Sequence, residues 1–173
     1  LRTGVTIGAP QDVLKAAQAL GAASICNIYG STETHGKCCV TPGTWTLEER
    51  AHCQGLPLPG VTLRIRDLET GTLLGTGATG GVEVSGYLMP GYRGDSAKHN
   101  ADVMTDDGWF RTGDLGRMDE QGRFHFAGRS SEMIKRSGIN VSPAEVEEAL
   151  QQHPDVGIAG VTGLADAHKG EAI

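Results

Sequence analysis

The feature that most restricts the fold of this chain is a repeated alternation of apolar and polar side chains across residues 56–128. The alternation occurs three times, at residues 61–66, at Val82 and Val84, and at Phe124 and Phe126. A period of two is typical of strands that bury one face. Glycine-rich turns separate these segments, and the 26 glycines are spread through such turns. We therefore expect a β-rich region in the middle of the chain.

The segment before this region is predicted to mix helix and strand. Pro10 favours the start of a helix, Gly21 favours its end, and the apolar side chains between them share one face. Residues 22–28 are predicted to form a buried strand that leads into a Tyr-Gly-Ser-Thr-Glu loop. The expected fold class is thus α/β, as a mixed α+β arrangement.

The segment after the β-rich region begins a second, smaller unit. Ser-Pro-Ala-Glu at residues 142–145 has the pattern of a capping box with proline at the first helical position. The helix that follows is predicted to bury one stripe of side chains, namely Val146, Ala149 and Leu150. Residues 156–161 are predicted to form a short strand. About 40 residues cannot bury a core of their own, so we expect this unit to be cut off at Ile173.

Composition excludes several classes of function. The formal net charge of −6 provides no field that would gather nucleic acid or an anionic membrane surface. No run of 18 apolar residues exists, so no membrane span is predicted. The chain lacks an initiator Met and a secretion signal at its start, and we expect it to be an internal fragment.

The cysteines favour reduced thiols in a cytoplasmic protein over a metal site. Their spacing does not match the common zinc patterns, although His35 and His52 lie nearby in the sequence. The four are Cys26, Cys38, Cys39 and Cys53.

Three motifs follow one another in fixed order. Asn-Ile-Tyr-Gly-Ser-Thr-Glu occupies residues 27–33, and Arg-Thr-Gly-Asp occupies residues 111–114. The third, Gly-Arg-x-x-x-x-Ile-Lys-x-x-Gly-x-x-Val-x-Pro-x-Glu-Val, occupies residues 128–146. Together they resemble the superfamily of acyl-CoA synthetases, peptide-synthetase adenylation domains and luciferases, and most closely its acyl-CoA synthetase branch.

The resemblance implies an AMP-forming ligase. Members of this superfamily activate a carboxylic acid with ATP and Mg²⁺ to an acyl-adenylate, releasing pyrophosphate, and many then transfer the acyl group to coenzyme A. Residues 1–129 would be the C-terminal part of the large AMP-binding domain with its β-rich subdomain. Residues 130–173 would be the start of the small α+β lid domain. The expected partners are a small-molecule carboxylic acid, ATP and CoA.

The resemblance also implies roles for residues in the first part of the chain. Tyr29 matches the aromatic residue that stacks on adenine, and Asn27 and Gly30 belong to the same loop. Thr32 would donate a hydrogen bond to the α-phosphate, and Glu33 would bind Mg²⁺ as a hard carboxylate ligand. A loop that lies along the nucleotide, where small residues let the backbone approach closely, matches Gly8, Ala9 and Pro10.

Four later residues have implied roles as well. Asp114 matches the carboxylate that accepts both ribose hydroxyls, and Arg129 matches the arginine that reaches the ribose and phosphates. Lys135 and Gly138 match lid positions used in thioester formation. Three of these residues also have an ordinary structural alternative, which is a β-turn aspartate for Asp114, a surface salt bridge for Arg129 and a solvated lysine for Lys135.

Departures from the family pattern limit what the chain would do alone. The hinge position two residues after Arg129 is Ser131, where Asp or Lys is usual, and Glu132 follows it. The upstream phosphate loop and the C-terminal catalytic lysine do not occur, and Lys169 comes too early to serve as that lysine. Without this cation the charge that develops on phosphate loses stabilisation. We expect the 173-residue chain alone to be inactive.

Two other functions stay open at the sequence level. A peptide-synthetase adenylation domain would pass the acyl group to a carrier-protein thiol instead of CoA. A non-catalytic nucleotide-binding remnant would keep Tyr29 and Asp114 without chemistry. The identity of the acid and the oligomeric state do not follow from the sequence.

Overall fold

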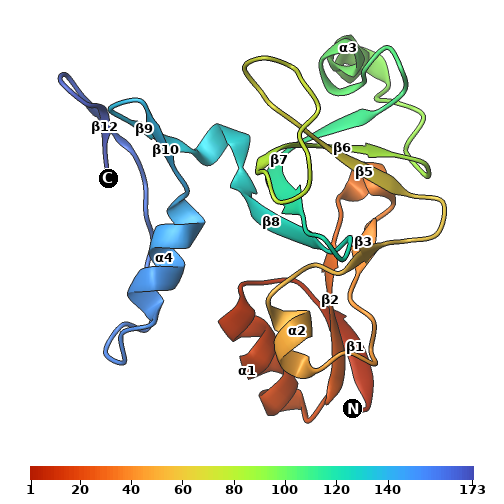
Figure 1. Cartoon of the computed structure of the whole chain (residues 1–173), viewed down its shortest axis with the longest axis vertical. Coiled ribbons are helices and arrows are strands. Elements are labelled where there is room, and N and C mark those ends of the chain that lie inside the picture. Colours follow the sequence, from red (N-terminus) through yellow and green to blue (C-terminus); the bar gives the residue numbers. More distant parts are fainter.

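The structure, a computed structural model, describes residues 1–94 and 96–173. The strands of the described residues form three four-stranded sheets that follow one another along the chain. Two sheets lie within residues 1–129, for which we use the name body, and the third lies within residues 130–173, for which we use the name C-terminal unit (Figure 1). Helices and strands are mixed throughout, as the sequence predicts.

The first sheet has the order β1-β2-β3-β4, with β1 parallel to β2 and the other pairs antiparallel. Helix α1 (Pro10–Leu20) begins and ends as predicted, because Gly21 adopts the left-handed conformation after the last turn. Its buried side chains, Val13 and Ala17, pack with Ile25 of β2. The other elements are β1 (Thr3–Thr6), β2 (Ser24–Tyr29), β3 (Cys39–Val40), α2 (Leu47–Ala51) and β4 (Leu56–Pro57).

The second sheet is antiparallel with the order β5-β6-β7-β8, and so confirms the predicted β-rich region. Val82 and Val84 are buried in its core. The strands are β5 (Thr62–Arg66), β6 (Gly80–Ser85), β7 (Phe110–Met118) and β8 (Phe124–Arg129). Between β6 and β7 the chain forms two short helices, η2 (Gly94–His99) and α3 (Asn100–Val103), at the far end of the body (Figure 1).

The alternation fails in β6, where Glu83 is as deeply buried as the valines beside it. Its carboxylate is paired with Arg64 at 2.5 Å and with Arg66 at 3.2 Å. The guanidinium of Arg64 also lies 4.2 Å from the centre of the Trp109 ring. A buried carboxylate is tolerated because these cations compensate its lost hydration. The polar face of this sheet is therefore an ion-pair layer instead of a solvent face.

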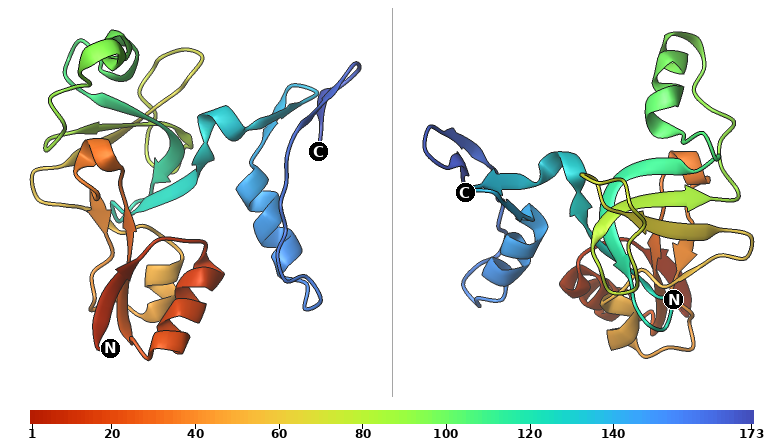
Figure 2. Two further views of the ribbon diagram at one scale, coloured as in Figure 1. Left: turned by 180° about the vertical axis from the view of Figure 1, so that it is seen from behind. Right: turned by 45° about the horizontal axis from the view of Figure 1, so that its top comes forward.

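The third sheet has the order β10-β9-β12-β11. Ser142 caps helix α4 (Pro143–Gln151), with its Oγ accepting a hydrogen bond from Glu145 N at 3.4 Å. The predicted capping box is only half formed, because the Glu145 side chain does not return a hydrogen bond to the backbone of Ser142. The remaining elements are η3 (Ser130–Glu132), β9 (Ile134–Arg136), β10 (Ile139–Val141), β11 (Leu164–Asp166) and β12 (Gly170–Ala172). Figure 2 shows this unit from two further sides, joined to the body through the segment after β8.

Two predictions for the C-terminal unit are wrong. The expected apolar stripe of α4 is not buried, since Leu150 is 47% exposed. Residues 156–161 form no strand. The strand lies later, in β11, where a turn stabilised by Asp166 Oδ1 returns the chain to pair with β12. Gly157 and Gly160 interrupt the earlier segment, which suits a loop more than a strand.

None of the helices in the described residues is long and apolar enough to cross a membrane. The four cysteines are free thiols, and three of them are buried. Within the same residues, no group of three His, Cys, Asp or Glu side chains is placed to hold a metal ion.

Candidate nucleotide site between the body and the C-terminal unit

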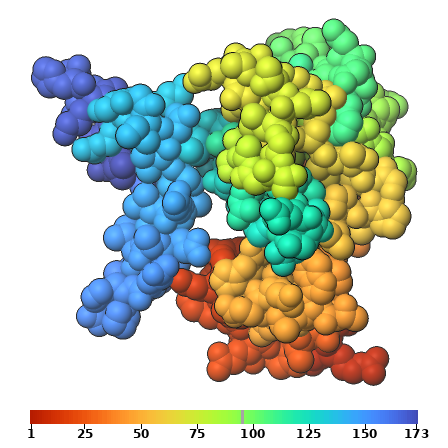
Figure 3. All heavy atoms as spheres, in the orientation of Figure 1, coloured from red at the N-terminus to blue at the C-terminus, as the bar shows by residue number. Residues whose placement is uncertain are grey.

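A cavity of about 740 Å³ lies between the body and the C-terminal unit. Figure 3 shows the hollow between the blue C-terminal unit and the body. Eight of the twelve residues singled out in the sequence line it: Gly8, Ala9, Pro10, Asn27, Tyr29, Gly30, Asp114 and Arg129. These residues come from four separate segments of the chain, so the fold brings the implied nucleotide residues together.

Asp114 lies on the cavity wall because of a bulge in β7. The ladder between β6 and β7 shifts register around Thr112 and Gly113, and Gly113 has a φ of 75°. Such a φ favours glycine. Arg-Thr-Gly-Asp therefore forms a bulged strand, and not the β-turn that was the structural alternative for Asp114. Thr112 Oγ1 fixes the bulge by donating to Val82 O at 3.0 Å and accepting from Asp114 N at 3.1 Å.

The carboxylate of Asp114 is buried and only partly satisfied. The Tyr29 hydroxyl donates to Oδ2 at 2.6 Å. Arg129, its neighbour across the β7–β8 ladder, brings Nε within 2.9 Å of Oδ1. This contact is an ion pair but not a hydrogen bond, because the guanidinium N–H is not aligned with Oδ1, and no other N–H or O–H of the described residues donates to that oxygen. Burial raises the pKa of Asp114, although the Tyr29 hydrogen bond and Arg129 oppose the shift.

Tyr29 is fixed from both ends. Its hydroxyl bonds Asp114, and its ring centre lies 4.5 Å from that of Phe124 and 6.1 Å from that of Phe126. Burial, together with the Asp114 charge, raises the pKa of this phenol, so it stays protonated and donates. The tyrosine lines the cavity with only 8% of its surface exposed.

Phe126 lines the cavity, although the sequence pattern predicts that its side chain is buried in the core. The alternation predicts a buried side chain, yet Phe126 is 41% exposed and lines the cavity, whereas Phe124 is fully buried. The ladder between β7 and β8 is regular from Phe124 to Phe126, so the two rings share one face of β8. Phe124 packs in the apolar cluster that contains Tyr29, whereas Phe126 lies farther along the strand, at the cavity. An aromatic face that is open toward a cavity suits stacking on a base. Phe126 therefore joins Tyr29 as a candidate for that contact.

Asn27, Gly30 and Gly8 shape the backbone of the cavity wall. Asn27 is fully buried, donating to Cys53 O at 3.1 Å and accepting from Ile28 N at 3.0 Å. A Cβ on Gly30 would lie 2.4 Å from Lys37 Cα, so this position requires glycine. A Cβ on Gly8 would come within 3.1 Å of the Asp12 Cβ. The side chain of Asn27 thus supports the cavity wall through its hydrogen bonds to the backbone.

Thr32 and Glu33 lie beyond the cavity lining, in the short helix η1 (Thr32–Thr34) that follows Gly30. The Tyr92 hydroxyl donates to Glu33 Oε1 at 2.7 Å. Partial burial opposes ionisation of Glu33, but hydrogen bonds, Tyr92 among them, lower the pKa of the carboxyl overall. Glu33 is therefore an ionised carboxylate, three residues after the cavity residue Gly30. Such a group suits a hard divalent cation.

Lys135 and Gly138 do not reach the cavity. Lys135 is exposed on β9, and Gly138 is exposed in the turn before β10. At the junction, Ser130 Oγ donates to Gly113 O at 2.8 Å, while Ser131 is exposed. Of the implied residues, the structure therefore leaves Thr32, Glu33, Lys135 and Gly138 outside the cavity lining.

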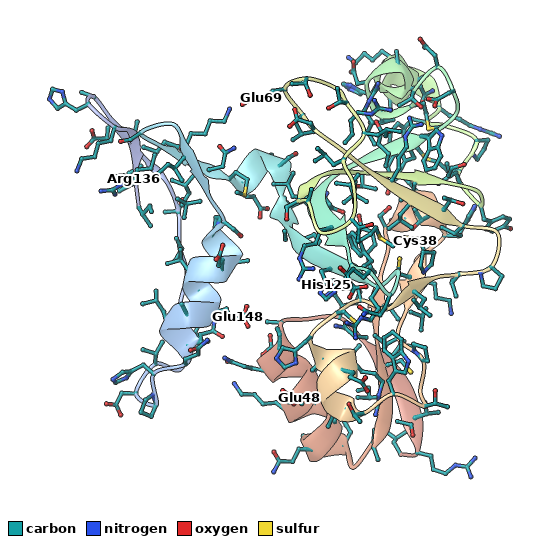
Figure 4. The ribbon with its side chains drawn as sticks, viewed as in Figure 1. Cys38, Glu48, Glu69, His125, Arg136 and Glu148 are labelled. Carbon is teal, nitrogen blue, oxygen red and sulfur yellow. The ribbon has the colours of Figure 1, made fainter. Side chains whose placement is uncertain are left out.

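The C-terminal unit contributes acidic side chains that the sequence reading did not single out. Glu145 and Glu148, one turn apart on α4, line the cavity opposite the body. Figure 4 shows Glu148 on the flank of α4 that faces the body. The only sequence signal is their spacing of three residues, which places both on one helix face. The cavity is thus bounded by carboxylates on both sides, namely Asp114 of the body and these two residues of α4.

Comparison with known proteins gives this site its context. A family model described as AMP-binding enzyme matches residues 1–93. The chain belongs to the AMP-binding enzyme family. The resemblance and the mixed α/β fold class inferred from the sequence are both confirmed, including the acyl-CoA synthetase branch.

Similar proteins extend over nearly the whole chain. The medium-chain acyl-CoA ligase ACSF2, mitochondrial, of Mus musculus is 36% identical over 100% of this chain and 29% of its own length. ATP-bound MatB of Rhodopseudomonas palustris superposes with a TM-score of 0.84 at 33% identity, over 96% of this chain and 33% of that one. The amide bond synthetase McbA of Marinactinospora thermotolerans gives a TM-score of 0.85 at 35% identity, over 99% of this chain and 35% of that one. This chain therefore spans about a third of these proteins or less.

Proposed function

We propose that this chain is part of an ATP-dependent acid–CoA ligase that forms an acyl-adenylate, releases pyrophosphate, and then makes the CoA thioester. The observation that carries the proposal is the buried Asp114 carboxylate on the cavity wall, whose Oδ1 is paired with Arg129 at 2.9 Å but accepts no directed hydrogen bond from the described residues. Such an oxygen has lone pairs left to accept hydrogen bonds. Vicinal ribose hydroxyls of ATP are donors of the kind that would satisfy it.

The other walls of the cavity support a nucleotide. Arg129 is half exposed beside Asp114 and is available to attract phosphate or ribose oxygens. Phe126 and Tyr29 offer aromatic rings for adenine. The Gly8–Pro10 loop, as the start of α1, presents backbone to the same space. These residues would bind and orient ATP without contributing protons to the reaction.

Glu33 is our candidate ligand for Mg²⁺. Its carboxylate is held ionised, and a carboxylate oxygen is the ligand type that Mg²⁺ prefers. The cation would neutralise charge on the phosphates as pyrophosphate leaves. Thr32, exposed beside it, would donate its hydroxyl to the α-phosphate.

We assign CoA as the acceptor, in preference to a carrier-protein thiol. The support is the name of the Mus musculus relative, an acyl-CoA ligase that matches the whole chain. Lys135 and Gly138 would serve this second half-reaction, because both are exposed on the C-terminal unit and lie away from the cavity. The division of the chain at Arg129 and the cytoplasmic location remain predictions. The name of the same relative includes the word mitochondrial.

The test uses the protein at its natural full length. Purified enzyme is incubated with ATP, Mg²⁺ and a panel of aliphatic and aromatic acids, with and without CoA. We expect acid-dependent pyrophosphate release and a CoA thioester detected by mass. Transfer of the acyl group only to a carrier-protein thiol would show that this thiol, and not CoA, is the acceptor, and would overturn the CoA assignment. ATP binding without pyrophosphate release for any acid would leave a nucleotide-binding protein and overturn the proposal.

A further inference from the structure

Tyr92 lies outside every motif used above, yet it contacts the implied metal ligand. Its hydroxyl donates to Glu33 Oε1 at 2.7 Å, across 59 residues of sequence. The same loop makes a second contact, in which Met89 N donates to Glu33 O at 2.9 Å. The loop before η2 therefore fixes both the backbone and the carboxylate of Glu33.

Tyr92 is itself held by the first residue of α3. Asn100 Oδ1 accepts from Tyr92 N at 2.7 Å, and Asn100 Nδ2 donates to Tyr92 O at 3.1 Å. Gly91 permits this clamp, because its φ is 117° and a Cβ there would come within 3.2 Å of the Asn100 amide. Two hydrogen bonds from one amide group fix the backbone from which the phenol extends. The contact with Glu33 is therefore supported by a rigid local structure.

We propose that Tyr92 is a positioning residue that holds the Glu33 carboxylate for Mg²⁺-bound ATP, an inference that rests on the proposed function. The phenol donates a hydrogen bond to one carboxylate oxygen, Oε1, so Oε2 would be the oxygen that binds the cation. A carboxylate fixed in this way loses less rotational freedom on binding metal. Partners that orient a metal ligand change metal affinity by about 10-fold to 100-fold when they are removed.

The test compares two tyrosines at natural full length. Tyr92→Phe removes only the hydroxyl that touches Glu33. Tyr87→Phe is the matched control, since Tyr87 lies in the same loop, is 72% exposed and stacks on His35 with ring centres 4.4 Å apart. Titration calorimetry measures the affinity for ATP with Mg²⁺ and for ATP with a chelator in the wild type and both variants.

For Tyr92→Phe we expect Mg²⁺–ATP binding to weaken about tenfold, with metal-free ATP binding unchanged. Tyr87→Phe should match the wild type in both titrations. Equal weakening with and without Mg²⁺, or the same loss in both variants, would show a general disturbance of the loop and overturn the inference. Unchanged Mg²⁺–ATP binding in Tyr92→Phe would also overturn it, while the ligase activity of the wild type would leave the proposed function intact. Wild-type ATP binding that does not respond to Mg²⁺ would overturn both.

Discussion

The body and the C-terminal unit approach the same cavity with different kinds of structure. The body has two clusters of buried apolar side chains, and its cavity residues are tied to one another, as in the Tyr29–Asp114 hydrogen bond. In the C-terminal unit only Ile134 and Ser142 are buried among the described residues. Its catalytic candidate, Lys135, is exposed. The body therefore presents a preorganised cavity wall, whereas the C-terminal unit is held by few buried side chains.

The largest effect that would sharpen this contrast comes from Asp114→Asn at natural full length. Replacing the carboxylate weakens charge-assisted hydrogen bonds of about 1.5–3 kcal/mol, so we expect ATP to bind about tenfold to 100-fold more weakly. Calorimetry measures the affinity. Asp67→Asn, in an exposed turn of the same subdomain, is the control and should bind ATP normally. If Asp114→Asn binds ATP as tightly as the wild type does, Asp114 does not bind the nucleotide, and the proposed role of this cavity wall is wrong.

The contribution of ion pairs to the stability of the body can be tested at Asp119. It accepts hydrogen bonds from Arg123 at 2.6 Å and contacts His125 Nε2 at 2.9 Å. Burial opposes its ionisation, but His125 and Arg123 lower the pKa of the carboxyl overall. A lowered pKa in the folded state stabilises the protein above the ordinary aspartate pKa of about 3.9, and the stabilisation fades as the pH falls below it.

We therefore expect Asp119→Asn to lower the free energy of unfolding by about 2 kcal/mol at pH 7, and by progressively less below pH ~4. Denaturant unfolding at several pH values measures the difference. A difference that stays constant with pH would show that the ion pair contributes nothing. ATP affinity at pH 7 should not change, because Asp119 does not line the cavity.

The C-terminal unit can be tested at Lys135. Lys135→Ala should slow thioester formation about tenfold or more through loss of a cation, while acid-dependent pyrophosphate release stays normal. Single-turnover assays of the two half-reactions separate these rates. Lys169→Ala, another exposed lysine of the unit, is the matched control. A loss in the first half-reaction would instead place Lys135 at the nucleotide site.

The smallest effect is expected at Ser142, which caps α4 and also donates to Ala127 O of the body at 3.0 Å. Ser142→Ala should cost about 1 kcal/mol, and the loss should appear as faster hydrogen exchange in α4 with no change in β7. Ser131→Ala, at an exposed position of the same unit, should leave exchange unchanged. Faster exchange throughout β7 would mean that the two parts are one cooperative unit.

Local patterns predicted much of this fold, and tertiary contacts explain the rest. Pro10 and Gly21 delimit α1, and alternation locates the central strands, because both signals act within a few residues. The bulge at Gly113 depends on cross-strand register and could not be predicted locally. The strand expected at residues 156–161 failed for the same reason, since strand formation needs a partner.

The candidate site divides in the same way. Motifs identified Tyr29 and Asp114, but their hydrogen bond joins residues 85 positions apart, which no local pattern reveals. Phe126 was predicted to be buried because alternation identifies the apolar face of β8 but does not show where that face leaves the core and meets the cavity. Tyr92 carries no motif signal and is recognised only by its contact with Glu33.

The most direct test of the central claim is a crystal structure of the full-length protein with ATP and Mg²⁺. The account predicts that both ribose hydroxyls lie within hydrogen-bond distance, about 2.5–3.0 Å, of the Asp114 carboxylate, with Oδ1 accepting at least one. A nucleotide bound elsewhere, or a ribose that turns away from Asp114, would contradict it.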